Sequence, residues 1–280
     1  MASSRPDGAW TRRDLLKGVG AAAIGAIGGT AAHGFLYERH HVSLTRTVLE
    51  VSGLADSLSG FRIGFISDLH RSQTVPHELG ESAVRVLTAE QPDLVVLGGD
   101  YVTWGDRAFV EPAAEVLAPL SAPHGVVAVL GNHDDDRDMP AALARRGFTV
   151  LRDARTQIRV HGEPFDVAGI RYWTRKPADI AQVLRGASSN LLLAAHTPSR
   201  LIEAAALSVP VMLSGHTHGG QIVLPGAGAL AARRFPVVAG QGRRENTTIF
   251  VSRGVGTVYI PVRVNCPPEV VIVTLKPATE

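Results

Sequence analysis

The 280-residue chain has little of several features that would point to a particular class of protein. Cys266 is the only cysteine, so no disulfide can form within the chain and a disulfide scaffold is excluded. The segment "NCPPE" places no histidine beside this cysteine, so packing is a better expectation for it than nucleophilic chemistry. No repeat of fixed period is present, which excludes a solenoid.

Excess charge is also nearly absent, because the formal net charge is +2. Residues 1–33 account for all of it, and their charged residues are Arg5, Arg12, Arg13, Lys17, Asp7 and Asp14. The rest of the chain is therefore near neutral. Nucleic acid is not an expected partner, since such binding depends on a basic surface.

A long, strongly apolar run is missing as well. The run "VGAAAIGAIGGTAA" (19–32) is interrupted by glycines and is shorter than the roughly 20 apolar residues that a spanning helix needs. It follows "TRRDLLKG", and together the two segments resemble a twin-arginine signal. A chance pair of arginines before an alanine-rich helix is the alternative.

The signal interpretation assigns residues 1–36 to a twin-arginine signal peptide or an uncleaved signal anchor. Small residues near Ala31 and Ala32 offer a cleavage site, and no nearby cysteine supports a lipoprotein. The expected partner is the twin-arginine export machinery. The expected location is the periplasm, the cell wall or the outer face of the cytoplasmic membrane.

What the chain does contain is an alternation of short apolar runs with helical patterns. Hydrophobic residues make up 45% of the chain, enough for one large globular unit, and we expect a monomer. Buried strands are predicted at 61–67, 93–99, 125–131, 190–195 and 209–215, with helices at 76–91, 111–120, 138–147, 178–186 and 199–207. Strands joined by turns follow in the later sequence. The pattern predicts an α/β fold in which two sheets pack face to face with helices outside.

Polar side chains follow each of the five predicted buried strands. The segments are "SDLH" (67–70), "GGD" (98–100), "GNHD" (131–134), "AH" (195–196) and "GHTH" (215–218). Open α/β sheets place ligand sites at the carboxyl ends of their strands, so these groups are expected to converge. Any one aspartate alone would be read as a helix cap, and any one histidine as a core residue. Five such segments at five strand ends favour a metal site instead.

In order and spacing, "DLH", "GGDYV", "GNHD", "AHTP" and "GHTHGG" resemble the calcineurin-like metallophosphoesterases. The resemblance covers residues 60–275, and the arginine pair together with the C-terminal sequence is similar to the exported bacterial YkuE/YaeI-type phosphodiesterase branch. It implies a four-layer α/β/β/α sandwich of two mixed sheets. The corresponding domain is residues 42–280.

The resemblance further implies a centre for two divalent metal ions. Its pattern makes Asp68, His70 and His218 ligands of one ion, and Asn132, His196 and His216 ligands of the other, with Asp100 bridging both. Two carboxylates neutralise only part of the charge of two divalent ions, so the site keeps a net positive charge that attracts phosphate. Mn²⁺ or Fe²⁺ is expected ahead of Zn²⁺, because imidazole, amide and carboxylate ligands are mixed.

The implied activity is hydrolysis of phosphodiester or pyrophosphate bonds by a hydroxide that bridges the two ions. The implied substrate is a phosphate ester of the cell envelope that is linked to a lipid or a nucleotide. Membrane surfaces and lipid headgroups are further candidate partners. The alternative is a non-catalytic metal-binding or envelope-binding protein on the same scaffold. Monoesterase, cyclic nucleotide phosphodiesterase and lipid pyrophosphatase activities share these ligands.

Four further residues are candidates around the metal ligands. The resemblance makes His133 the catalytic residue that protonates the leaving group or stabilises charge on phosphorus, with orientation of the ligand shell as the alternative. Arg71, Arg233 and Arg234 are candidate substrate contacts, because a guanidinium matches phosphate geometry. The alternative for the arginine-rich segment 221–263 is a solvated loop.

Overall fold

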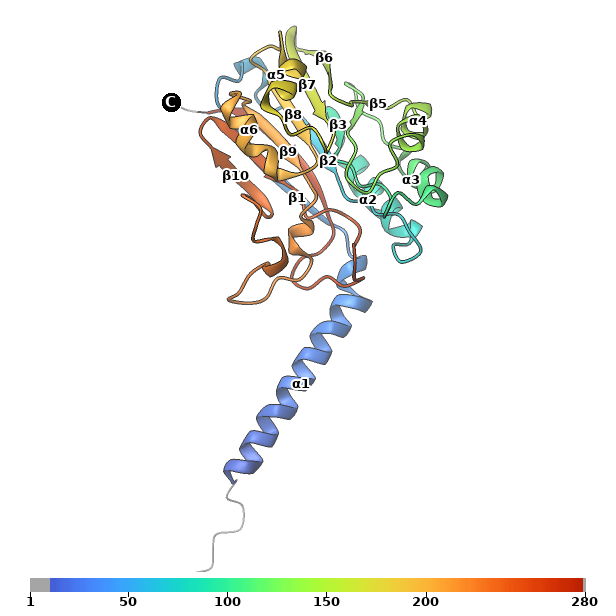
Figure 1. Cartoon of the computed structure of the whole chain (residues 1–280), viewed down its shortest axis with the longest axis vertical. Coiled ribbons are helices and arrows are strands. Elements are labelled where there is room, and N and C mark those ends of the chain that lie inside the picture. The colour runs from blue at the N-terminus through green and yellow to red at the C-terminus, as the bar shows by residue number, and fades with distance from the viewer. Residues whose placement is uncertain (1–10, 279–280) are drawn as a thin grey trace, which may run out of the picture.

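The computed structural model describes residues 11–278, and two six-stranded sheets form its centre (Figure 1). The first sheet has the order β1-β12-β2-β3-β4-β5 and is parallel except where β12 meets β2. Its strands are β1 (Ser43–Val51), β2 (Arg62–Ile66), β3 (Leu94–Leu97), β4 (Val126–Ala128), β5 (Thr149–Val150) and β12 (Glu269–Pro277).

The second sheet has the order β10-β11-β9-β8-β7-β6 and is antiparallel only at its two edges. Its strands are β6 (Ala154–Val160), β7 (Glu163–Ile170), β8 (Leu191–Ala195), β9 (Val211–Ser214), β10 (Gly240–Arg244) and β11 (Thr247–Val251).

Alternation of side chains along each buried strand divides the core into layers. In β3, Leu94 and Val96 face the second sheet, whereas Val95 and Leu97 face helices. The helices against the first sheet are α2 (His77–Ala89), α3 (Val110–Leu117) and α4 (Asp138–Arg145), and those against the second are α5 (Pro177–Leu184) and α6 (Leu201–Ala206). Apolar residues project from both faces of each sheet. Each sheet is therefore covered on one face by the other sheet and on its opposite face by helices. The predicted four-layer sandwich is confirmed.

Short 3-10 helices complete the chain between these elements. They are η1 (Glu38–His40), η2 (Asp56–Leu58), η3 (Arg107–Phe109), η4 (Pro198–Arg200), η5 (His218–Gly220) and η6 (Leu230–Ala232). The five predicted buried strands and the predicted helices correspond to observed elements, with boundaries shifted by one or a few residues.

Helix α1 (Arg12–Leu36) extends away from the sandwich (Figure 1). Thr11 caps it reciprocally with Asp14, so the helix begins at the arginine pair. Within the helical stretch Arg12–His40, a window of 18 residues has a mean hydropathy of 1.4. The length and composition of the helix would suffice to cross a membrane, a test that signal sequences also pass. Residues 1–10 of the expected signal lie outside the described residues.

The last turn of α1 and η1 are joined to the loop before β12. The carbonyl of Gly34 accepts a hydrogen bond from the Arg263 amide (3.3 Å), and the Glu38 carboxylate accepts from the amides of Asn265 (3.1 Å) and Cys266 (2.5 Å). A Cβ on Gly34 would lie 2.4 Å from the Arg263 carbonyl oxygen, so only glycine permits this approach. The helix therefore ends on the loop that leads into the last strand.

Candidate metal centre

The polar groups predicted at the strand ends lie together at one edge of the two sheets. Two groups each offer three ligand atoms within 4.8 Å of one another: Asp68 with His70 and His218, and Asp100 with His196 and His216. The segments after β2, β3, β8 and β9 supply them, because the carboxyl ends of these strands meet at the same edge. Their assignment to particular ions stays a prediction.

The first group is a buried triangle of one carboxylate and two imidazoles. Nε2 of His70 lies 3.1 Å from Nε2 of His218, and Nε2 of His218 lies 3.4 Å from Oδ1 of Asp68. The backbone amide of His216 donates to both oxygens of Asp68 at 3.0 Å, which fixes the carboxylate. Two imidazole nitrogens that face each other in this way are suited to share a cation.

Asp100 lies between the two groups. Its Oδ2 is 3.5 Å from Nε2 of His70 in the first group and 3.1 Å from Nε2 of His196 in the second. Its Oδ1 accepts a hydrogen bond from the His133 amide at 2.8 Å, so the carboxylate cannot rotate freely. In the second group, Nδ1 of His216 is 3.2 Å from Nε2 of His196.

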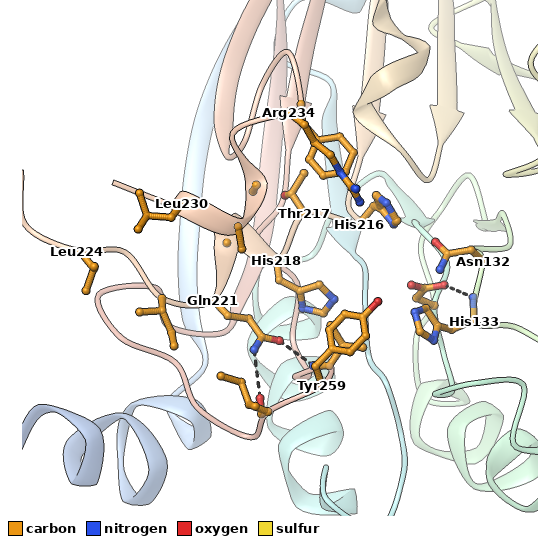
Figure 2. Close-up of a pocket in the computed structure, with 18 residues that line it drawn as sticks. Asn132, His133, His216, Thr217, His218, Gln221, Leu224, Leu230, Arg234 and Tyr259 are labelled. Carbon is orange, nitrogen blue, oxygen red and sulfur yellow. Dashed lines mark hydrogen bonds between the residues drawn. The ribbon is translucent and has the colours of Figure 1, made fainter. Parts of the chain in front are cut away.

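Asn132 supplies the seventh predicted ligand atom. It lines the same pocket as Asp100 and His216, and Figure 2 shows it beside His133. Its Oδ1 is buried and has no hydrogen-bond donor among the described residues. A buried acceptor without a partner costs about 1–3 kcal/mol. A cation bound at Oδ1 would satisfy it, so the donor set fits a pair of divalent ions.

The backbone at these ligands is strained. Asp68, His70, Asp100, His216 and His218 all have φ between 47° and 71°, the left-handed region that non-glycine residues avoid. Such conformations cost of order 1–3 kcal/mol each and persist where the surroundings impose them, often at functional sites. Five such residues in one cluster therefore mark this part of the chain as a functional site.

Glycines pack directly against the ligand side chains. A Cβ on Gly131 would lie 2.0 Å from Oδ1 of Asp100, and one on Gly215 would lie 2.2 Å from Oδ2 of Asp68. Gly254 approaches Asp68 from the loop after β11. Glycine is therefore required at these positions to leave room for the ligands.

Hydrogen bonds fix which imidazole nitrogens face the centre. The carbonyl of Gly98 can only accept, so Nδ1 of His196 carries a proton (2.7 Å) and its Nε2 faces Asp100. Nδ1 of His70 is 3.2 Å from Oγ1 of Thr103, which itself donates to the His70 carbonyl. Oγ1 therefore accepts from Nδ1, and the lone pair on Nε2 faces the centre.

Burial and charge act in opposite directions on the pKa values of the ligands. Burial lowers the pKa of His70 to about 3 and, together with the charge of His196, that of His216 to about 3, so both rings are neutral. Burial also lowers the pKa of His196, but Asp100 and Asp68 outweigh it and raise the value to about 10. Burial would raise the pKa of Asp100, yet His196 and His70 hold it below its usual range. Burial raises the pKa of Asp68 to about 6, so the two carboxylates differ, and Asp100 is the one that holds its negative charge most firmly.

His133 is 6% exposed and projects into the pocket from the segment after β4. The amide of Trp104 donates to its Nδ1 at 3.1 Å. Since an amide can only donate, Nδ1 holds a lone pair and the neutral ring carries its proton on Nε2. Burial lowers the pKa of His133, which favours this neutral form.

Asp134, which follows His133 in "GNHD", is a supporting residue of the site. Its carboxylate accepts from the amides of Asp100 (2.8 Å), Tyr101 (2.7 Å) and Gly131 (2.8 Å), and so ties the segments after β3 and β4 together. Burial and Asp100 raise its pKa to about 7. The aspartate of "GNHD" is the sequence signal for it.

The three predicted arginine contacts lie in different surroundings. Arg234 lines the pocket beside His216, with its guanidinium 5.0 Å from the Phe235 ring centroid (Figure 2). Arg233 is exposed and donates to the Ala227 carbonyl (2.6 Å), and Arg71 donates to the Val75 carbonyl (2.8 Å). Neither Arg233 nor Arg71 is among the pocket-lining residues, and the substrate role of all three stays a prediction.

Two other arginines of the basic segment serve the fold. Arg253 pairs with Glu269 (2.9 Å). Arg263 has no exposed surface and donates to the carbonyls of Gly256, Cys266, Arg253 and Gly254. Cys266, as expected, is buried, and its thiol donates to the carbonyl of His218 at 3.2 Å.

Comparisons with known proteins agree with this arrangement. A family model described as calcineurin-like phosphoesterase matches residues 61–220. The uncharacterized metallophosphoesterase YkuE of Bacillus subtilis is 31% identical over 95% of this chain and 98% of its own. Phosphodiesterase YaeI of Escherichia coli is 33% identical over 79% of this chain and 84% of its own. An uncharacterized metallophosphoesterase of Aquifex aeolicus is 35% identical over 75% and 83%, respectively.

Proposed function

This chain belongs to the calcineurin-like phosphoesterase family, and we propose that it uses two divalent ions to hydrolyse phosphodiester or pyrophosphate bonds. The observation that carries the proposal is the position of Asp100, whose Oδ2 lies within 3.5 Å of an imidazole from each ligand group. A carboxylate oxygen within reach of an imidazole from each ligand group is suited to bridge a pair of ions. The phosphodiesterase name of the Escherichia coli relative supports a diester substrate.

Asp68, His70 and His218 would hold one ion, and Asn132, His196 and His216 the other. When bound, the ions would attract phosphate and lower the pKa of the attacking water. Mn²⁺ or Fe²⁺, with Zn²⁺ behind them, suits these ligands, because imidazole nitrogens are combined with carboxylate and amide oxygens.

His133 would act by donating a hydrogen bond from Nε2. Its Nδ1 already accepts the Trp104 amide, so a second ring proton would face that amide and be repelled. A neutral imidazole does not readily give up its remaining proton, so His133 would stabilise negative charge on a phosphate oxygen or on the leaving oxygen. Loss of one such donor typically costs about 10²–10³ in rate.

Arg234 would bind a non-reacting oxygen of the phosphate group. It is the one predicted arginine that lines the pocket, and the cavity of about 420 Å³ is large enough for a diester with two organic groups. A lipid-linked or nucleotide-linked phosphate ester from the cell envelope is the substrate class we favour.

An exported location would follow from the N-terminal segment. Arg12 and Arg13 open an exposed, apolar helix, as a twin-arginine signal peptide or signal anchor would require. Lysine at both positions, in the full chain fused to a reporter that is active only outside the cytoplasm, should abolish the reporter signal. An undiminished signal would count against recognition by the twin-arginine machinery.

Hydrolysis of bis-p-nitrophenyl phosphate and of the p-nitrophenyl monoester tests the activity. The full chain is freed of metal, reloaded with Mn²⁺, Fe²⁺ or Zn²⁺, and compared with His216→Ala and with His77→Ala, whose histidine lies on α2 outside the site. Metal-dependent cleavage of the diester that His216→Ala alone abolishes would support the proposal. Two bound ions without turnover would favour the non-catalytic metal-binding or envelope-binding alternative.

A further inference from the structure

The pocket over the metal centre has two chemically different halves. Its inner half is polar and contains metal ligands, His133 and Arg234. Its outer half is mostly apolar and is formed by Ile222, Leu224, Leu230, Ala232, Phe235 and Ile260, of which Phe235 reaches the metal ligands, with its ring centroid 5.3 Å from that of His216. Figure 2 shows Leu224 and Leu230 on one side of the pocket, farther out than His216 and His218. We call these six residues the apolar wall.

Several side chains of the apolar wall are exposed to solvent. Leu224 is 41% exposed, and Leu230 and Ile260 are each 48% exposed. Contiguous exposed apolar surface beside a site commonly marks a place where an apolar group binds. Two loops that carry the wall are held together by a backbone hydrogen bond, because the Val223 amide donates to the Val264 carbonyl (2.9 Å).

Two polar side chains that line the pocket beside the apolar wall, Gln221 and Thr217, are already used. Nε2 of Gln221 donates to the Ile260 carbonyl (3.1 Å), and its Oε1 accepts from the Val258 amide (2.7 Å). Oγ1 of Thr217 donates to the Val238 carbonyl (2.6 Å) and accepts from the Gly219 amide. Neither side chain is free to read the edge of a nucleobase. A flexible hydrocarbon needs no such partner and fits the aliphatic residues.

The apolar wall also lies beside the end of helix α1. Gly34 packs on Val264, and Val264 is bonded through the Val223 amide to the loop that carries Leu224. The C-terminal end of the helix therefore lies close to the loops that carry the wall. An amphiphile held at an apolar surface would meet the pocket with its chain along the wall and its phosphate toward the metal ligands.

Resting on the function proposed above, we propose that the apolar wall is a subsite for the hydrocarbon chain of an amphiphilic phosphodiester. The phosphate group would lie at the metal ligands and Arg234, and the chain would run outward over Leu224, Leu230 and Ile260. This arrangement selects a lipid-linked ester over a nucleotide-linked one.

Alkyl p-nitrophenyl phosphodiesters test the subsite. The full chain in lipid nanodiscs with Mn²⁺ is assayed on the ethyl and octyl esters, and wild type is compared with the double variant Leu224→Ser/Leu230→Ser. Ile202→Ser is the matched control, because Ile202 is 55% exposed on α6, away from the pocket. Taking the ratio of wild type to variant for each ester cancels the partitioning of longer esters into the lipid.

Each buried methylene contributes roughly fourfold to affinity. We therefore expect the wild-type to double-variant ratio of kcat/KM to be near one for the ethyl ester and at least about tenfold for the octyl ester. The control ratio should stay near one for both, and unchanged thermal unfolding would exclude a folding defect.

Equal ratios for the two esters in an active enzyme would overturn the subsite alone. An equal loss in Ile202→Ser on the octyl ester would overturn it as well. Absence of any diester hydrolysis, including that of the ethyl ester, would instead contradict the proposed function.

Discussion

Substitution of Gly254 by alanine should displace a metal ligand without replacing any predicted ligand. Gly254 has φ +69°, and a Cβ there would lie 2.6 Å from the Cβ of Asp68. Carbon atoms in contact stay about 3.5–4.0 Å apart, so the Asp68 side chain would have to move by roughly 1 Å. Metal sites tolerate shifts of only about 0.2 Å in ligand distance.

Two separate costs follow from this change. The left-handed backbone costs an alanine about 1–2 kcal/mol. The overpacking against Asp68 adds about 1–3 kcal/mol and should weaken binding of the ion at the first ligand group roughly 10- to 100-fold. Gly147→Ala is the matched control, because Gly147 has φ +84° but nothing within 4 Å of its added Cβ.

Calorimetric titration of metal-free protein with Mn²⁺, with denaturant unfolding alongside, separates the two costs. Both variants should lose free energy of unfolding from the backbone, but only Gly254→Ala should lose affinity at one of two sites together with diester hydrolysis. Two ions bound by Gly254→Ala with wild-type affinity would show that Asp68 does not hold a metal in the way described. Equal loss in Gly147→Ala would point to backbone strain as the cause.

Three further outcomes are expected. His133→Asn should retain more diester hydrolysis than His133→Ala, which should lose about 10²–10³ in kcat. Because the neutral ring is the active form, neither variant should remove a limb from the pH profile of kcat; disappearance of the alkaline limb in both would assign His133 as a proton donor. Glu38→Gln leaves a backbone amide of the loop before β12 without its carboxylate acceptor, and should lower the free energy of unfolding by about 1–3 kcal/mol. The exposed Glu81→Gln should not, and equal unfolding curves for the two variants would contradict a stabilising role for the bonds of Glu38 to Asn265 and Cys266. Removal of the metal by a chelator should lower Tm by roughly 5–10 °C for each ion whose free concentration was 100 times its Kd, as scanning calorimetry can measure. An unchanged Tm would refute coupling of metal binding to folding.

The strand ends of the site were predictable because their signals are local. A run such as "DLVVLGG" followed by Asp100 needs no knowledge of its neighbours to be read as a buried strand that ends at a polar group. Parallel pairing then brings the ends together. The approach of Asp68 to Asp100 therefore follows from strand order.

Other features depend on partners that are distant in the sequence. Strand β1 mixes charged and apolar residues, and its pairing with β12 is invisible without the fold, so it was not predicted. The segment 221–263 attracted notice for its arginines, yet its apolar residues form half of the pocket, and Arg263 is buried among carbonyls. Composition could not show which side chains of a loop face inward.

The pairing of β1 with β12 has a consequence for synthesis of the protein. Strand β12 lies between β1 and β2, so the first strand of the sandwich has no neighbour in its sheet until the last one exists. At about 5–20 residues per second, the ribosome would take roughly 10–45 s to make the intervening 220 or so residues. During that interval the N-terminal helix is tethered to an unfinished domain. Its docking through Glu38 onto the amides of Asn265 and Cys266 can therefore form only near the end of that interval.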